Sequence, residues 1–260
     1  MFTLYGCIFL VCVSFIHPIA LYAGKVLTAS IWLLNHTVLF INAIPFSLWN
    51  GFSTSIAETI LLYVVIMSFL YWLIKKNQTA FKLGICSALF FSGMLAAKRW
   101  NFSNQKKIIV YNVPGHRAID FINGYAYNFK GDSDLIIAGL LQDFNLKPGR
   151  ISLMLNRNEG IGFPLYQKND FYQFYGKRIL FIDSAIVYKS LAEKINVDYI
   201  VVSRNPKLFM ANLAGVFNCG MYIFDASNPL WKIEKWKKDC EELHLRFHSV
   251  PEQGAFVTDL

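Results

Sequence analysis

The stretch IAETILLYVVIMSFLYWLI, residues 56–74, decides the fold class of this chain. A helix of nineteen residues at 1.5 Å per residue crosses a hydrocarbon core of about 30 Å. Lys75 and Lys76 follow at once and fit an anchor at the membrane interface. Glu58 lies in the first turn, where a carboxylate reaches headgroup water and meets the positive end of the helix dipole. We therefore expect a transmembrane helix here, with Glu58 as an end-of-helix residue rather than a buried relay.

Charge divides the chain into two parts near Trp100. Residues 1–100 carry seven charged side chains, whereas residues 101–260 carry the other thirty-five. The composition, 55% hydrophobic and 16% charged, is too apolar for an ordinary soluble domain. Most of the net charge of +8 flanks apolar segments, which favours a role in membrane topology over nucleic-acid binding. We expect a membrane α-helical region over residues 1–100 and a water-soluble domain over residues 101–260.

Three further apolar segments lie in the first hundred residues. Residues 1–24 predict a retained membrane helix rather than a signal peptide, because no basic residue precedes Lys25. Residues 26–44 predict either a helix lying in the membrane surface or a full span, since polar groups are costly in hydrocarbon. That segment carries Asn35, His36 and Asn42. Residues 83–97 are short and span only with snorkelling lysines at their ends. The sequence therefore predicts between two and four membrane spans.

Basic residues also predict the orientation of the spans. By the positive-inside rule, the loop that holds Lys75, Lys76 and Lys82 is cytoplasmic. The soluble domain then lies on the non-cytoplasmic side of a plasma membrane. A second basic group argues for the opposite orientation, and its members are Lys98, Arg99, Lys106 and Lys107.

Residues 101–260 predict an α+β or layered α/β/α domain, because strand and helix patterns alternate along them. The expected strands are 107–113, 117–129 with a turn at Asn123-Gly124, 150–155, 177–182, 198–202, 221–224, 244–249 and 255–257. The expected helices are 133–144, which Lys147-Pro148-Gly149 should end, 186–195, 208–218 and 233–243.

The sequence designates no catalytic, cofactor-binding or metal-ligating residue. It has no phosphate-binding loop, no nucleophile elbow and no dinucleotide fingerprint. His244 and His248 have a metal-like spacing, but an alternating strand would separate them by about 13 Å on one face. Cys219 and Cys240 are the candidates for a disulfide, which the sequence leaves open. The aspartates, Asp120, Asp132, Asp134, Asp183, Asp198 and Asp225, are spread over turns and strand ends, where aspartate often shapes turns.

Both halves of the chain resemble the C-terminal portion of the ComEC-type competence proteins, the inner-membrane channels of natural transformation. The membrane half resembles the end of their competence domain through Leu34-Asn35, Ile44-Pro45-Phe46 and the pattern Glu58-x-x-Leu61-Leu62-Tyr63. The tail resembles the shortened extramembrane domain of one branch of that family. Its matching segments are Asp120–Ile122, Leu146–Pro148, Asn228–Ile233 and Gln253–Val257.

The resemblance implies a degenerate metallo-β-lactamase-like fold without its metal site. In other branches the first strand ends in Asp-Val-Gly-Gln-Gly-Asp-Ala, and a later strand is followed by Ser-His. This chain reads NVPGHRA at residues 112–118 and SRNPK at residues 203–207. The metal ligands are therefore replaced, and the resemblance implies a non-enzymatic domain with no cofactor.

Three functions are weighed on this basis. The first is a section of an inner-membrane DNA-uptake channel, with the membrane and other channel helices as partners and single-stranded DNA as a partner without an assigned site. The second is a truncated remnant without independent activity, since the family's other channel helices and N-terminal domain have no counterpart here. The third is a metal-dependent nuclease with unrecognised ligands, for which the candidates are His116, Asp120 and His248.

Overall fold

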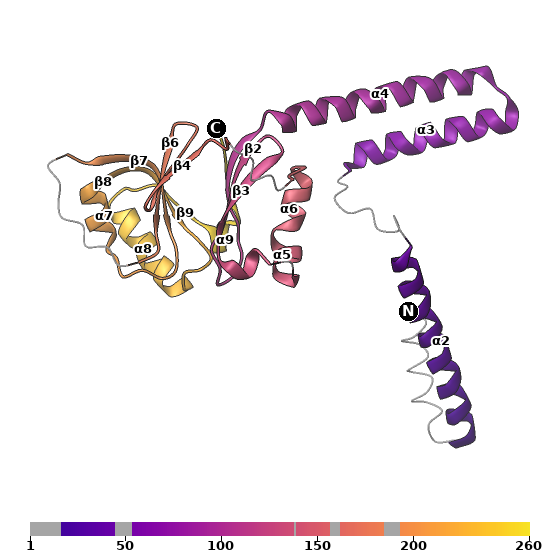
Figure 1. The fold of residues 1–260 in the computed structure, drawn as a ribbon, viewed down its shortest axis with the longest axis horizontal. Coiled ribbons are helices and arrows are strands. Elements are labelled where there is room, and N and C mark those ends of the chain that lie inside the picture. The colour runs from indigo at the N-terminus through magenta and orange to yellow at the C-terminus, as the bar shows by residue number, and fades with distance from the viewer. Residues whose placement is uncertain (1–16, 45–53, 138, 157–161, 185–192) are drawn as a thin grey trace. The chain divides into compact units, whose positions relative to one another are not determined.

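The computed structural model describes residues 17–44, 54–137, 139–156, 162–184 and 193–260 (Figure 1). They belong to two compact units, residues 1–52 and 53–260, which are described separately below. Three long apolar helices precede a mixed α/β domain with two sheets, which confirms the expected fold class. All three helices are long and apolar enough to cross a membrane.

The first unit contains helix α2, His17–Ala43. It runs without a break through Lys25, so the expected separation of two segments at that residue is wrong. The stretch Gly24–Ala43 within α2 is long and apolar enough to cross a membrane, which agrees with the full span that was one reading of residues 26–44. Residues 1–16 lie outside the described residues. Polar side chains of α2 are partly accommodated by the helix itself, because Thr28 and Thr37 donate to carbonyl oxygens four residues earlier. His36 stacks on Trp32 with ring centroids 5.1 Å apart, which agrees with a packing role.

The second unit begins with a helical hairpin of α3, Ile56–Lys75, and α4, Gln78–Ser103. Lys76 ends α3 in the left-handed conformation, and the Asn77 side chain caps the first turn of α4. Helix α4 extends well beyond the fifteen residues expected from hydropathy, because its polar ends continue the helical backbone. At 26 residues it is long enough to cross a bilayer without the snorkelling that the shorter segment required.

Glu58 ties the two helices of the hairpin together. It forms a capping box with Ser55, whose backbone N–H donates to Glu58 Oε2 at 2.8 Å. The same carboxylate lies 3.1 Å from Lys98 Nζ near the end of α4. The end-of-helix position expected for Glu58 is confirmed, and the ion pair to the neighbouring helix is an additional role.

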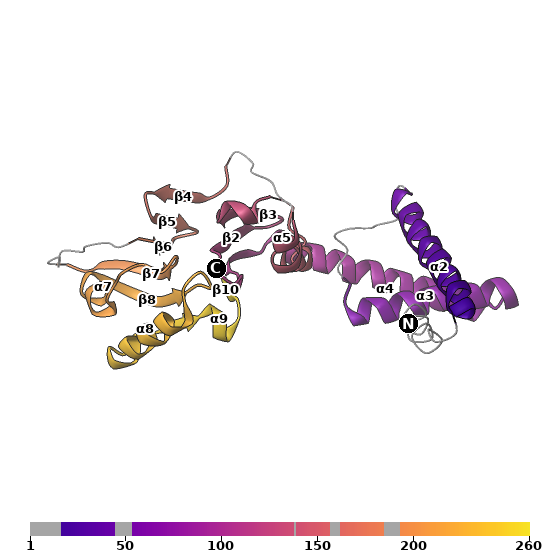
Figure 2. The same ribbon diagram turned by 90° about the horizontal axis from the view of Figure 1, so that it is seen from below.

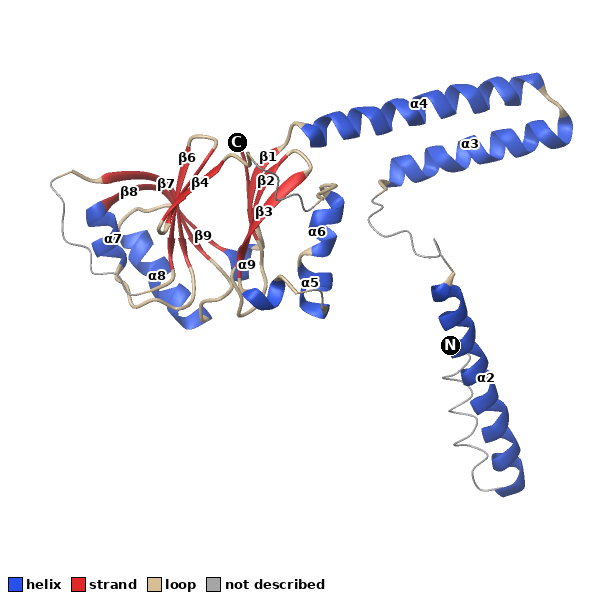
Figure 3. Ribbon diagram, viewed as in Figure 1, coloured by secondary structure: helices blue, strands red, loops and turns tan. Residues whose placement is uncertain are grey.

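The C-terminal α/β domain, which the sequence predicts to be water-soluble and which we call the extramembrane domain, is built on two sheets (Figure 3). The four-stranded sheet has the order β10-β1-β2-β3 and is antiparallel. Its strands are β1 Lys106–Val110, β2 Ala118–Asn123, β3 Ala126–Gly131 and β10 Phe256–Asp259. The six-stranded sheet has the order β4-β5-β6-β7-β8-β9, and β6 to β9 run parallel. Its strands are β4 Leu165–Lys168, β5 Phe171–Phe174, β6 Lys177–Ile182, β7 Ile195–Val202, β8 Phe217–Phe224 and β9 Phe247–Ser249.

Helices cover the outer faces of both sheets, so the domain has four layers (Figures 1 and 2). The outer side of the four-stranded sheet carries η1 Ser133–Leu135, α5 Leu140–Asn145 and α6 Lys147–Ser152. The outer side of the six-stranded sheet carries α7 Met210–Val216 and α8 Leu230–Glu242, while the short α9, Val250–Gln253, connects β9 to β10. This arrangement agrees with the layered sheet-and-helix domain expected from the alternating patterns.

Three apolar clusters hold the layers together. Phe121 and Phe174 meet between the two sheets, with ring centroids 5.4 Å apart. Phe224 and Trp236 pack between the six-stranded sheet and α8, and Leu146 fills the space between the four-stranded sheet and its helices. The alternation along β2 sends Phe121 to the inter-sheet core and Ile122 to the opposite face.

Several expected elements differ from the observed ones. The strand expected at 150–155 is wrong, because Pro148 lies in the first turn of α6 rather than ending a helix, and proline is well accommodated there. The helix expected at 133–144 is interrupted, since Gly139 is fully extended between η1 and α5. The strand expected at 244–249 begins only at Phe247, because His244 takes the left-handed conformation after α8. The helix expected at 186–195 lies mostly outside the described residues, and Ile195 opens β7.

The end of α4 is bonded to the extramembrane domain. Tyr125 in the β2–β3 turn donates its hydroxyl to the carbonyl oxygen of Arg99 at 2.6 Å. The Gln105 side chain donates to the carbonyls of Gly124 and Leu153, each at 2.9 Å. The end of the domain that is joined to α4 is therefore the end that carries the β2–β3 turn.

Candidate functional site

Three parallel strands end at one edge of the six-stranded sheet, and a polar residue follows each of them. Asp183 follows β6, Ser203 and Arg204 follow β7, and Asp225 follows β8. Because the carboxyl ends of parallel strands meet at the same edge, these side chains converge there. Ligand-binding sites in sheets with parallel strands usually form at that edge, so this edge is the candidate functional site.

The four-stranded sheet contributes residues to the same edge. Arg117 precedes β2 and Asp132 follows β3, so the antiparallel pairing of these strands sets the two residues side by side. Two hydrogen bonds join them: the backbone N–H of Arg117 donates to the side-chain Oδ2 of Asp132, and the backbone N–H of Asp132 donates to the carbonyl oxygen of Arg117, each at 3.0 Å. Gly115 N donates to the carbonyl oxygen of Ala226 at 2.8 Å and joins the two sheets at this point.

Two arginines and two aspartates form what we call the arginine–aspartate cluster: Arg117, Asp132, Asp183 and Arg204. Arg204 reaches Asp132 Oδ1 at 2.5 Å and lies 3.8 Å from Asp183. Arg117 donates to Asp183 Oδ2 at 3.3 Å, so each carboxylate contacts a guanidinium group. His116 Nδ1 lies 3.5 Å from Asp132 at the edge of the cluster. The cluster crosses from one sheet to the other and is neutral when its four charged groups are ionised.

The charges in the cluster stabilise one another. Partial burial opposes ionisation of Asp132, but the hydrogen bonds from Arg204 and from the backbone of Arg117 outweigh it and lower the pKa of that carboxyl. The hydrogen bond to Asp132 raises the pKa of Arg204 in turn. Asp132 therefore stays ionised near neutral pH and does not act as a proton donor there.

Asp225 lies beneath the cluster and is completely buried. Its Oδ2 accepts from Ser203 Oγ at 2.5 Å, and its Oδ1 accepts from the backbone N–H of Ser227 at 3.0 Å and from Asn228 Nδ2 at 3.0 Å. Burial raises the pKa of Asp225 to about 6 in spite of these bonds. The Ser203 hydroxyl donates to Asp225 within this network and is itself buried, so it is not accessible to a substrate.

The raised pKa of Asp225 predicts a pH-dependent stability. The folded chain holds this proton up to about pH 6, whereas the unfolded chain releases it near the ordinary value of 3.8. Stability contributed by the group is present below pH 4 and is lost as the pH rises to about 6, up to about 3 kcal/mol at 1.36 kcal/mol per pKa unit. Urea unfolding of the wild type and of Asp225→Asn at pH 4 and 7 measures it. Identical pH dependence in the two proteins would contradict the assignment.

The loop after β7 is held in an uncommon conformation. Arg204 and Asn205 are consecutive residues with φ of 58° and 56°, a region that residues other than glycine enter at a cost. Ser227 Oγ accepts from Arg204 N at 2.6 Å, and Asn228 Oδ1 accepts from Asn205 N at 2.9 Å. These bonds from the loop after β8 fix the backbone and direct the Arg204 side chain to Asp132.

The cluster is suited to holding charge in place rather than to acid–base or metal chemistry. Within the described ranges, no three histidine, cysteine, aspartate or glutamate side chains are grouped so that they could hold a metal ion. Asp132 and Asp183 already accept from guanidinium groups, which would have to be displaced before a cation could bind.

The three residues considered as ligands of a nuclease, His116, Asp120 and His248, have different partners. His116 faces Asp132. Asp120 is buried on the outer face of the four-stranded sheet, where Arg150 Nε and Tyr111 Oη donate to it at 2.8 and 2.9 Å. His248 in β9 contacts the carbonyl oxygen of Gly254 at 3.0 Å. Their side chains are engaged in three separate places.

The histidine pair and the cysteine pair that the sequence pointed to also have defined positions. His244 lies just after the end of α8 and His248 lies in β9, so the continuous strand that was to separate them does not form. Cys219 and Cys240 are free thiols. Cys240 lies in the apolar core between β8 and α8, and Cys219 packs against that core. Burial raises the pKa of both thiols to about 12, so they behave as apolar core residues.

Sequence reasoning did not identify the arginine–aspartate cluster, although it named Asp132, Asp183 and Asp225 as strand-end residues. One sequence feature could have revealed the cluster. The strands before Asp183, Arg204 and Asp225 are buried apolar runs, and such runs are typical of parallel strands that end at the same edge of a sheet. The segments 112–118 and 203–207, which the family resemblance aligned with metal-binding motifs of other branches, both contribute residues to this edge.

Comparison with known proteins gives one match. The family model described as the ComEC C-terminal domain matches residues 108–260, which covers the extramembrane domain from β1 to the last residue. No curated protein and no solved structure matches the chain. The matched residues are more than half of the 260 in the sequence, and they contain both sheets and the arginine–aspartate cluster. The chain therefore belongs to the ComEC C-terminal domain family.

Proposed function

We propose that this chain is the C-terminal section of an inner-membrane channel for DNA uptake in natural transformation, and that its extramembrane domain is not catalytic. The observation that carries the proposal is the order of its parts. Three membrane-capable helices precede a domain of the ComEC C-terminal family, and α4 is bonded to that domain through Tyr125 and Gln105.

The helices support a role in association with other membrane segments. Along α2 and on the outer surface of the α3–α4 hairpin, many large apolar side chains are exposed, including Trp32, Phe40 and Tyr63. Lipid or neighbouring helices would cover such surfaces in a membrane. By the positive-inside rule, the basic residues of the α3–α4 turn favour a cytoplasmic position for that turn and a non-cytoplasmic position for the domain.

The arginine–aspartate cluster supports a non-catalytic domain. Arg117 and Arg204 occupy the edge where the parallel strands end, and their guanidinium groups are bonded to Asp132 and Asp183. A metal-dependent hydrolase needs carboxylate or imidazole ligands with an open position for water. Here the corresponding carboxylates are engaged with fixed positive groups, which favours a structural or binding role.

Deletion of the gene in its naturally competent host tests the proposal. Transformation with a purified, selectable chromosomal fragment is expected to fall to the level of a strain without a channel, and a plasmid copy of the gene is expected to restore it. Electroporation of the same strain serves as the control, because it bypasses uptake but still requires recombination. A deletion strain that transforms normally would contradict the proposal and would indicate a remnant without independent activity.

A further inference from the structure

A cationic and aromatic surface lies beside the arginine–aspartate cluster, on the loop after β7 and the first turns of α8. We call it the lysine–tryptophan patch, and its members are Lys207, Phe209, Leu230, Trp231, Lys232 and Lys235. The Trp231 side chain is 69% exposed and Phe209 is 64% exposed. By contrast, Ile233 and Trp236 of the same helix are buried in the core, so the fold does not need Trp231 for packing.

Bonds and ring contacts organise the patch. Lys232 Nζ donates to Asn205 Oδ1 at 2.7 Å and to the Asn205 carbonyl at 3.2 Å, which joins α8 to the loop after β7. Lys235 Nζ lies 5.8 Å from the centre of the Phe209 ring. Trp231 and Lys235 are four residues apart on α8 and are therefore neighbours on one helix face. Lys235 thus lies near the Phe209 ring and shares a helix face with Trp231.

The positive charge of the patch is not neutralised by acids of α8. The first turn of that helix holds no acidic residue, and Glu234 is directed to Lys237 at 3.0 Å. Partial burial and then repulsion from Lys207 and Lys235 lower the pKa of Lys232. Three lysines close enough to repel one another would gain from a bound polyanion.

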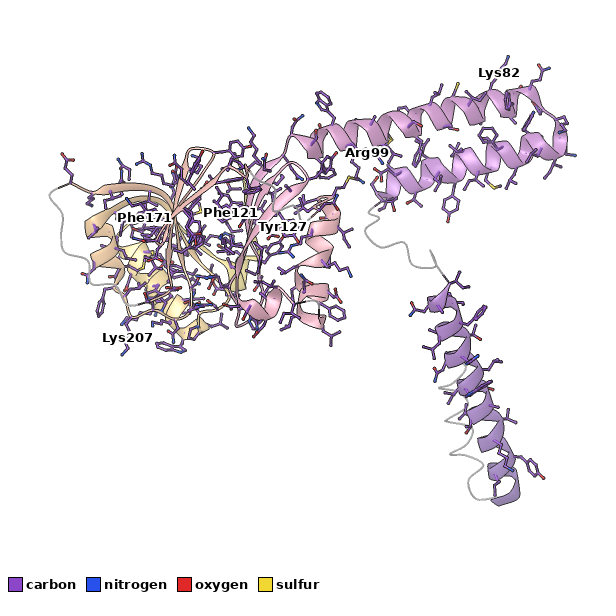
Figure 4. The ribbon with its side chains drawn as sticks, viewed as in Figure 1. Lys82, Arg99, Phe121, Tyr127, Phe171 and Lys207 are labelled. Carbon is purple, nitrogen blue, oxygen red and sulfur yellow. The ribbon has the colours of Figure 1, made fainter. Side chains whose placement is uncertain are left out.

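The position of the patch favours a polyanion in solution over the bilayer. Figure 4 shows Lys207 and Arg99 on opposite sides of the extramembrane domain. Arg99 lies at the end of α4 where that helix joins the domain, so the patch is directed away from the membrane attachment. Exposed rings together with lysines are the arrangement by which proteins bind single-stranded nucleic acid, with bases stacked on rings and phosphates on ammonium groups.

We propose that the lysine–tryptophan patch binds single-stranded nucleic acid, with Trp231 and Phe209 stacking on bases and Lys207, Lys232 and Lys235 contacting phosphates. The proposal builds on the proposed function in DNA uptake, and it supplies the contact surface for the strand that the sequence alone did not provide. Because stacking and phosphate contact do not read base edges, the binding is not sequence-specific.

Fluorescence anisotropy tests this inference. A labelled oligothymidylate of twelve nucleotides is titrated with the purified full chain in mild detergent, and the binding affinity is measured. Trp231→Ala is expected to weaken binding between about 5-fold and about 100-fold, whereas Trp231→Phe, which keeps a stacking ring, stays within about 3-fold of the wild type. Lys207→Glu/Lys235→Glu is expected to make the slope of log affinity against log salt shallower by about 1.4, since each lost phosphate contact contributes about 0.7.

Matched controls lie elsewhere on the domain. Tyr166→Ala removes another exposed ring, on β4, and Lys147→Glu/Lys168→Glu makes the same change in net charge as the double variant in the patch. Both controls are expected to leave affinity within about 3-fold of the wild type. Equal losses in the patch and control variants would overturn the proposal in favour of unspecific attraction. If Trp231→Ala had no effect and polyglutamate displaced the oligonucleotide at equal charge concentration, an acidic polypeptide would be the occupant and the proposal would be wrong.

The two proposals fail in different ways. Oligonucleotide binding that depends on Trp231, in a protein whose deletion leaves transformation normal, would refute the role in DNA uptake but keep the binding site. Binding that is indifferent to Trp231, in a protein whose deletion abolishes transformation, would refute the site but keep the role.

Discussion

Replacing Asp120 by asparagine is expected to lower the free energy of unfolding of the extramembrane domain by about 3–5 kcal/mol, because it leaves the charge of Arg150 buried without a partner. Arg150 donates to both carboxylate oxygens of Asp120, from Nε at 2.8 Å and from Nη2 at 3.0 Å. Its guanidinium carbon also lies 4.3 Å from the centre of the Tyr127 ring. Burial raises the pKa of Asp120, and the bonds from Arg150 and Tyr111 oppose that shift.

Urea unfolding of the full chain in detergent, followed by far-ultraviolet circular dichroism, measures this loss. The matched control is Asp120→Asn/Arg150→Met, which removes both charges and keeps an acceptor for the Tyr111 hydroxyl. It is expected to recover more than half of the loss, since replacing a buried ion pair as a whole is far less costly than breaking it. A loss below about 1 kcal/mol for Asp120→Asn would show that the pair does not hold α6 to the sheet, and would return Asp120 to the list of candidate ligands.

Replacing Trp236 by alanine is expected to destabilise the domain by about 3–5 kcal/mol, the usual cost of removing a large aromatic side chain from a core. Trp236 is 1% exposed, and its ring lies 5.4 Å from that of Phe224 between α8 and the six-stranded sheet. The cavity would open directly beneath the lysine–tryptophan patch, because Lys232 Nζ lies 5.3 Å from the Trp236 ring centre.

Trp231 is the natural comparison, since the same residue type lies five positions earlier in the same helix. Trp231→Ala is expected to change the free energy of unfolding by no more than about 0.5 kcal/mol, as exposed substitutions usually do. Thermal melts of the two variants therefore separate packing from binding. A loss of several kcal/mol in Trp231→Ala would contradict its exposure and remove the argument that this side chain is kept for a ligand.

The membrane helices and the buried strands could be predicted from the sequence because their signals are local. Residues 56–74 coincide with α3 except at its last residue, and the strand expected at 177–182 has the bounds of β6. Strands β4 and β5 were missed, since Leu165–Lys168 and Phe171–Phe174 are short and pair as a hairpin at the edge of the sheet. The 150–155 segment was assigned wrongly because the burial of Arg150 depends on Asp120, thirty residues earlier.

The candidate site was less predictable than the fold. The family resemblance drew attention to segments 112–118 and 203–207, yet nothing local in the sequence shows that Arg117 and Arg204 contact the carboxylates of Asp132 and Asp183. That contact forms only because an edge of the four-stranded antiparallel sheet meets the edge of the six-stranded sheet at which its parallel strands end. The segment Asn228–Ile233 was noticed only as a family resemblance, and the exposure of Trp231 within it is a property of the folded helix.

Entry of fluorescent DNA into the cytosol of competent cells tests the central claim most directly. Labelled DNA is added to wild-type, deletion and complemented strains, external DNA is removed with nuclease, and the protected signal inside the inner membrane is quantified. We expect the deletion strain to bind DNA at its surface but to accumulate none in the cytosol, and the complemented strain to regain entry. Protected cytosolic DNA at the wild-type level in the deletion strain would contradict the claim that this chain is part of the DNA-uptake channel.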